Sequence, residues 1–116
     1  MKILTSVALV AMLGSLGSCT INPHSMDMTQ AVQSARTRSD HENLAKHYED
    51  AAKEMQVKAE EHKKLLARYE GNARFYTGFA RTFTNEHETL VAIYERAVAP
   101  NMRMAEAHRQ MAAEAK

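Results

Sequence analysis

The 116-residue sequence lacks the features of several common functional classes. Lys and Arg number 15 against 14 Asp and Glu, so the basic excess that nucleic-acid binding requires is missing and no nucleic-acid partner is expected. There is no nucleophile motif, phosphate-binding loop or paired-carboxylate constellation, which argues against an enzyme. There is one cysteine, and no Cys-x-x-Cys-His motif for covalent haem. With these classes disfavoured, the sequence is informative chiefly about the location and the fold of the protein.

One apolar run is present, and it lies at the start of the chain. Met1 and Lys2 form a short basic beginning, and residues 3–16 are almost entirely apolar or small. The run is too short for a bilayer-spanning helix of about 20 residues, and no second apolar run follows. A basic start, a short apolar run and small residues at its end are typical of a signal peptide.

The residues that end this run carry a resemblance to a known class. Leu16, Gly17, Ser18 and Cys19 resemble the lipobox of bacterial lipoproteins. The resemblance covers the first 19 residues and implies cleavage before Cys19, a diacylglycerol thioether on its sulfur and an acylated amino terminus. It implies nothing about the mature fold. The alternatives are a secretory signal with a chance cysteine, or an uncleaved anchor.

Lipidation of Cys19 has consequences for both chemistry and location. It leaves no thiol for a disulfide, a metal site or a nucleophile. Several buried acyl chains hold a protein on a membrane where a single chain would not. By resemblance to the enteric sorting rule, Thr20 after the cysteine favours the outer membrane. We therefore expect residues 1–18 to be the signal peptide, with the mature protein on the periplasmic face of the outer membrane.

The mature chain divides into a spacer and a helical domain. Residues 19–38 form the lipidated N-terminus and a polar spacer, in which residues 28–36 can form a short helix. From Ser39 onward Glu, Lys, Ala, Leu and Met dominate, and turn residues are nearly absent until Gly71, which is helix composition. Ser39 stands three residues before Glu42, as in a capping box. This predicts a domain over residues 39–116 with a helix beginning near residue 40.

The domain repeats itself with a shift of 46 residues. Residues 41–70 and 87–116 share ten identities in thirty positions, and Asn85 corresponds to the capping Ser39. Written in heptads from His41 and His87, positions a, d and e are mostly apolar, with Lys58 as an exception, which predicts a buried stripe on each helix. The opposite face of the first helix carries glutamates four residues before lysines and is expected to face solvent. The Glu/Lys pairs are Glu42/Lys46, Glu49/Lys53, Glu54/Lys58 and Glu60/Lys64.

The connection and one proline interrupt this pattern. Gly71 and Gly78 are expected to break the helices, while Phe75, Phe79 and Phe83, spaced four apart, predict an apolar helical turn that belongs to the core. Pro100 removes a backbone donor inside the second unit, which predicts a kinked or split helix.

These observations predict an all-α fold. We expect an antiparallel helical hairpin from a duplicated helix unit, with helices near residues 40–70 and 86–115. Two amphipathic helices cannot fully enclose their apolar stripes. A short third helix, or dimerisation into a four-helix bundle, would complete the bundle.

The repeated histidines define the candidate site. In the antiparallel hairpin, facing residues sum to about 149, so His41 faces His108 and His62 faces His87. One interpretation is that they form hydrogen-bonded polar layers that fix the helix register. The other is a copper or zinc site, although there is no His-x-x-x-His or Glu-x-x-His companion motif.

Other residues bear on these two interpretations. Four methionines could supplement a copper(I) site but are more typical of core filler; they are Met55, Met102, Met104 and Met111. His24, in the spacer, and His47, off the stripe, are expected to face solvent.

Two functions follow as expectations. The first is a non-catalytic, membrane-tethered envelope lipoprotein that presents a helical structural or interaction module to an envelope protein or to a second copy of itself. The alternative is a periplasmic metal-binding protein that uses His41, His62, His87 and His108.

Overall fold

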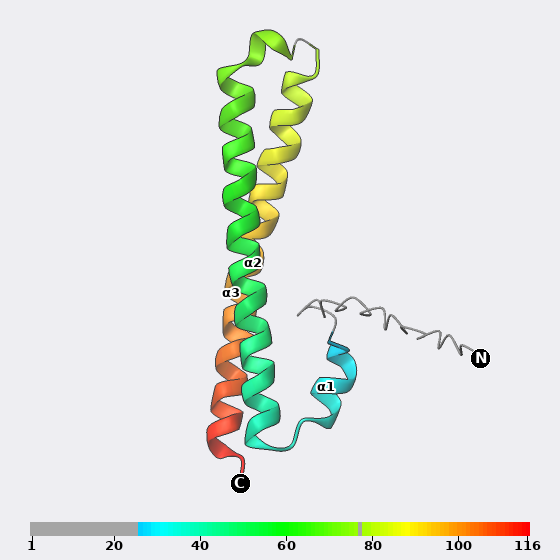
Figure 1. Cartoon of the computed structure of the whole chain (residues 1–116), viewed down its shortest axis with the longest axis vertical. Coiled ribbons are helices and arrows are strands. Elements are labelled where there is room, and N and C mark those ends of the chain that lie inside the picture. The colour runs from blue at the N-terminus through cyan, green and yellow to red at the C-terminus, as the bar shows by residue number, and fades with distance from the viewer. Residues whose placement is uncertain (1–25, 77) are drawn as a thin grey trace, which may run out of the picture.

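The computed structural model describes residues 26–76 and 78–116, so the expected signal peptide, Cys19 and His24 lie outside the described residues. The elements are helix α1 (Met28–Ser34), helix α2 (Arg38–Gly71), the 3-10 turn η1 (Ala73–Phe75) and helix α3 (Ala80–Glu114). Helices α2 and α3 run side by side in opposite directions, and α1 lies beside the start of α2 (Figure 1). The described part of the chain has no strand. The predicted all-α hairpin with a short additional helix is confirmed.

Helix α2 begins two residues earlier than expected, because a different capping box starts it. The Thr37 hydroxyl accepts a hydrogen bond from the Asp40 amide at 3.1 Å, and an Asp40 carboxylate oxygen accepts from the amides of Arg36 and Thr37 at 3.0 and 2.9 Å. These backbone donors stabilise the carboxylate and lower the pKa of Asp40 to about 2. The predicted Ser39/Glu42 capping box is wrong, since both residues lie inside the helix.

Helix α3 also begins earlier than expected. It starts at Ala80, whose amide donates to the Tyr76 carbonyl at 2.7 Å, so Asn85 lies within the helix and does not cap it. Helix α3 is not split at Pro100 but continues through it. The Asn101 side-chain amide donates to the Ala97 carbonyl at 2.8 Å beside the proline. Packing on α2 over a long contact stabilises the helix against the loss of one backbone bond.

The core between the two long helices is made chiefly of alanine. Position e supplies most of it, namely Ala45, Ala52, Ala59, Ala105 and Ala112, joined by Leu44 and His108. The expected burial of position d is wrong for three residues, which are 37 to 46% exposed: Leu65, Met104 and Met111. Alanine lets the helix backbones approach closely along positions a and e, which turns much of position d toward the outside.

Ion pairs close one side of the hairpin. Lys63 pairs with Glu95 at 2.8 Å, and Arg109 pairs with Glu49, so both contacts join α2 to α3. Of the expected pairs within α2, Glu54 and Lys58 meet at 3.8 Å. Glu42 instead pairs with Arg38, at 2.7 Å. The charged face is therefore partly used to hold the two helices together.

The phenylalanines of the connection are not core residues, contrary to expectation. Phe75 and Phe79 are 69% and 66% exposed, and Phe83 is 36% exposed. Gly78 has a φ of 92°, a conformation that glycine adopts without a steric penalty, and it makes the reversal before α3. The rings stay exposed because the hairpin ends here, and no other element of the described chain covers its tip (Figure 1).

Candidate functional site

The four histidines of the candidate site come together in two pairs between α2 and α3. The Nδ1 atoms of His62 and His87 lie 2.7 Å apart, and those of His41 and His108 lie 3.2 Å apart. Both pairs join a residue of α2 to one of α3, so the predicted facing register is confirmed. The His41/His108 pair also forms, although Pro100 precedes His108 in α3.

Each separation corresponds to a hydrogen bond between two imidazoles. One ring carries its proton on Nδ1 and donates it, while the other ring offers the Nδ1 lone pair, so the two rings of a pair are in different neutral tautomers. A pair with one added proton keeps this bond, because an imidazolium Nδ1–H still donates to a neutral ring. A second proton removes the acceptor and places two positive charges in contact.

Tyrosines cover the pairs from the opposite helix. Tyr94 of α3 stacks on His62 with ring centroids 5.5 Å apart and planes 12° apart, and Tyr69 of α2 stacks on His87 at 5.3 Å and 22°. Tyr48 of α2 stacks on His108 at 5.7 Å and 8°. Each tyrosine lies one heptad along its own helix from a histidine, yet it covers the histidine of the other helix. The rings fix the imidazole orientation by packing.

The two pairs differ in their surroundings. His108 is buried, with 5% of its surface exposed, whereas His41, His62 and His87 are half-buried. Burial, followed by the charge of His41, lowers the pKa of His108 below its ordinary value of 6.5. Protonation of the His108 ring is therefore disfavoured in the folded chain.

The geometry bears directly on metal binding. Two nitrogen ligands of a tetrahedral zinc ion, each about 2.05 Å from the metal, are about 3.3 Å apart. The 2.7 Å separation of His62 and His87 is shorter than that and matches a hydrogen bond, while the 3.2 Å separation of His41 and His108 fits either. Within residues 26–76 and 78–116, no group of three or more His, Cys, Asp or Glu side chains is placed to hold a metal ion. Each pair therefore supplies two nitrogen donors at most.

The methionines considered as copper ligands do not lie in an enclosed site. Met102, Met104 and Met111 are 44%, 42% and 46% exposed, and Met55 is half-buried. His47 is also half-buried, and its ring meets Tyr48 edge to face at 5.8 Å, so its exposure to solvent is partial.

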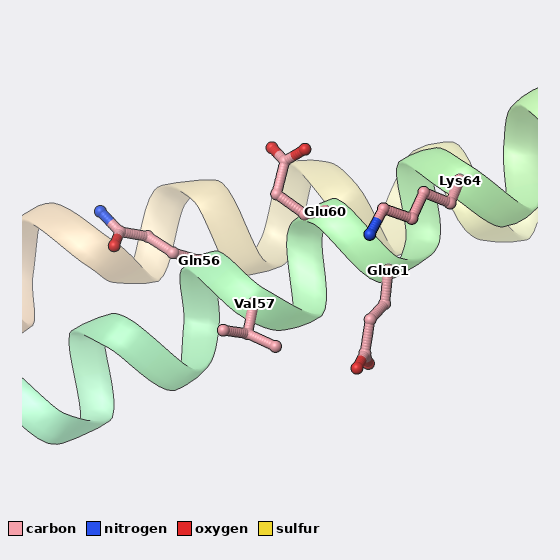
Figure 2. A pocket seen from close by; sticks show the side chains of 5 residues that line it. All are labelled: Gln56, Val57, Glu60, Glu61 and Lys64. Carbon is pink, nitrogen blue, oxygen red and sulfur yellow. The ribbon is translucent and has the colours of Figure 1, made fainter.

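Four surface depressions of the described residues are not lined by any histidine of the two pairs. The depression in Figure 2, of about 320 Å³, is lined by Gln56, Val57, Glu60, Glu61 and Lys64. All five side chains arise from successive turns of α2, with the second helix behind it, so the depression lies between side chains of one helix and not in a cleft between helices (Figure 2). No histidine lines it.

The described helices do not meet the requirements of a membrane-spanning helix. None of them, over residues 26–76 and 78–116, combines the length and apolar character needed to cross a bilayer. No protein family, curated protein or solved structure shows significant similarity to this chain. Function must therefore be argued from the hairpin itself.

Proposed function

We propose that this protein is a non-catalytic, membrane-tethered lipoprotein of the cell envelope, attached through Cys19, whose hairpin is a helix-pairing module for a second copy of itself. The attachment is supported by the lipobox resemblance of residues 16–19. The pairing is supported by one structural observation, an uncharged seam on the outer flank of α3.

The α3 seam consists of seven residues spaced alternately three and four apart. Its members are Leu90, Ile93, Ala97, Pro100, Met104, Ala107 and Met111. This alternation keeps them in line over about six helical turns, and it is the spacing with which helices pair in coiled coils. Ile93 is 53% exposed. A hydrophobic residue of this size on a pairing seam is available to a partner helix.

The α3 seam lies on the side of the hairpin that the ion pairs leave open. In heptads numbered from His87, the seam occupies positions d and g, whereas Glu95 and Arg109 occupy position b. At 100° per residue, position b lies on the other side of position a from d and g. One side of the hairpin is therefore closed by charged contacts between α2 and α3, and on the opposite side the flank of α3 is uncharged.

The composition of the core supports a second copy as the occupant. Leu44 is the largest fully buried side chain of the described residues, so the hairpin buries little apolar volume by itself. Two hairpins meeting through their seams would form a four-helix bundle and place Met104, Met111 and Ile93 in its interior. The same histidine layers would then fix the register inside each half of the bundle.

Light scattering of the full chain in detergent, which separates protein mass from detergent mass, tests the pairing. The wild-type chain is expected to have twice the monomer mass, and a Met104→Glu, Met111→Glu variant the monomer mass, because a dimer would bury the introduced carboxylates. Val57→Glu is the matched control, since Val57 is 57% exposed on α2 and lies off the seam. A monomeric wild-type chain, or a dimer that survives the double substitution, would refute pairing through the seam.

Metabolic labelling with a fatty-acid analogue tests the attachment separately. Incorporation of label that Cys19→Ser abolishes is the expected result. Labelling that persists in Cys19→Ser, or a wild-type chain that takes up no label, would show that Cys19 is not the anchor.

A further inference from the structure

We propose that the hairpin tip is a second membrane contact, a peripheral binding site for a bilayer surface that carries anionic phospholipids. The tip is defined as residues 68–76 and 78–83. It comprises the end of α2, the turn η1 and the beginning of α3, and it lies at the far end of the hairpin from α1 (Figure 1).

The first observation is a platform of exposed aromatic rings. Phe75 and Phe79 project from the tip with about two thirds of their surface exposed. Phe79 stacks on Phe83 with centroids 6.2 Å apart, and Phe83 in turn contacts Tyr69 at 5.1 Å and Tyr76 at 6.3 Å. The ring of Phe79 therefore packs on a cluster of inner rings that contact one another.

The second observation is that basic charge is concentrated at the same place. The tip carries three arginines, Arg68, Arg74 and Arg81, against one acidic residue, Glu70. The rest of the chain from residue 20 onward carries eleven basic and thirteen acidic side chains. The tip is thus net positive while the remainder is net negative, and none of the three arginines forms an ion pair within the described residues.

One of the tip arginines contacts one of the exposed aromatic rings. The guanidinium carbon of Arg74 lies 4.8 Å from the centre of the Phe75 ring, which is a cation–π contact. Phe79 and Arg81 are two residues apart in the turn that opens α3. Apolar rings flanked by arginines match the boundary between headgroups and acyl chains, where rings enter the apolar layer and cations meet lipid phosphates.

Charge complementarity favours a bilayer over a second copy at this surface. Two tips brought together would place like-charged arginines in contact, whereas an anionic bilayer would neutralise them. The tip is about 50 Å from the start of α2 along the 34-residue helix. The tip is therefore at the opposite end of α2 from the residues at which that helix begins.

The absence of tryptophan from the sequence makes a selective optical test available. Phe79→Trp places a single indole on the tip, and this variant is the tip reporter. Val57→Trp places a matched indole on an exposed position of α2, and this variant is the control reporter. Each full-length variant is reconstituted with vesicles of phosphatidylcholine alone or of phosphatidylcholine with phosphatidylglycerol. The readouts are the wavelength of maximum emission and quenching by brominated lipid.

The expected result is a shift of the tip reporter's emission to shorter wavelength, with loss of most intensity to brominated lipid, on the phosphatidylglycerol vesicles only. The control reporter should show neither effect. Adding Arg74→Gln and Arg81→Gln to the Phe79→Trp variant should abolish the shift, and so should high salt, because the attraction is electrostatic. Circular dichroism of the same samples checks that the helices remain folded.

Three outcomes would overturn the proposal. One is unchanged emission of the tip reporter on anionic vesicles, and another is an equal response on both lipid compositions. The third is a tip-reporter emission that is already shifted without phosphatidylglycerol and reverts on dilution, which would identify a second copy as the occupant. Co-sedimentation of the chain with neutral vesicles reports attachment through the anchor independently, so failure at the tip and failure of the tether give different results.

Discussion

His62 of α2 and His87 of α3 are joined through their Nδ1 atoms at 2.7 Å, although 25 positions separate them in the chain. The bond requires the two rings to hold different tautomers, so each ring depends on the other for its protonation state. Two residues related in this way should be energetically coupled, and that coupling is measurable.

Replacing one histidine of the pair should lower the free energy of unfolding by more than the loss of its own packing contacts explains. His62→Leu removes the partner of His87 and leaves a half-buried ring nitrogen without its hydrogen bond, at a cost of about 1 kcal/mol in the free energy of unfolding. The His62→Leu, His87→Leu double variant should recover much of that loss. Urea denaturation of the wild type, both single variants and the double variant gives the coupling energy. Strictly additive effects would show that the two rings do not depend on each other.

Stability should fall as the solution becomes mildly acidic. The pKa of His108 is lowered in the folded chain, so the unfolded chain binds a proton first as the pH drops below about 6.5. The stabilising contribution is therefore complete above that pH and is lost as the pH falls through the folded pKa of His108. His41 and Tyr48 of α2 are the groups that face its ring.

Thermal unfolding followed by circular dichroism between pH 8 and pH 5 checks this expectation. The midpoint should decline in the wild type and decline less in a His41→Leu, His108→Leu variant. The contribution of Asp40 stays constant in this range, because its ordinary pKa of 3.8 and its folded pKa of about 2 both lie below pH 5. An identical decline in both proteins would place the acid sensitivity elsewhere.

The two overlapping capping signals at the start of α2 can be separated by substitution. Thr37→Ala removes the hydroxyl that accepts from the Asp40 amide and should destabilise the chain by about 1 kcal/mol. Ser39→Ala is the control and should change stability by less than about 0.5 kcal/mol. Chemical denaturation measures both, and a larger effect at Ser39 would restore the capping box that the sequence predicts.

A titration distinguishes a hydrogen-bonded pair from a metal site. Calorimetry of the metal-free chain with zinc and with copper is expected to show no submicromolar, stoichiometric binding, because each pair offers two nitrogens and a tight zinc site uses three or four ligands. The His62→Ala, His87→Ala variant serves as the control. Stoichiometric heat that this variant lacks would favour the metal-binding alternative.

The helix register was predictable from the sequence for a specific reason. Identical residues recur at position a of both units, and antiparallel pairing of a repeat with itself brings His41 to His108 and His62 to His87, whatever the details at the helix ends. The helix boundaries were harder to predict. Thr37 and Ser39 both precede an acidic residue by three positions, and the pattern alone does not rank the two caps.

The rotation of each helix about its own axis and the exposure of the phenylalanine rings at the tip depend on packing, which the sequence pattern does not specify. The sequence assigns positions a, d and e to one apolar stripe, but the alanines of position e set how closely the backbones meet, and this leaves Met104 and Met111 outside. Likewise the spacing of Phe75, Phe79 and Phe83 predicts an apolar helical face without specifying what covers it. Whether a side chain is buried depends on its own character and on the surface that covers it. The sequence pattern describes only the first of these.

The alanine core has a calorimetric consequence. Heat capacity of unfolding rises with the apolar area exposed, by about 0.45 cal per mole per kelvin for each Å², and alanine contributes little area. The hairpin should therefore unfold with a small heat-capacity change and have a flat stability curve. Its free energy of unfolding would then be less curved with temperature than that of a domain with a core of large apolar side chains, and cold would weaken the fold less.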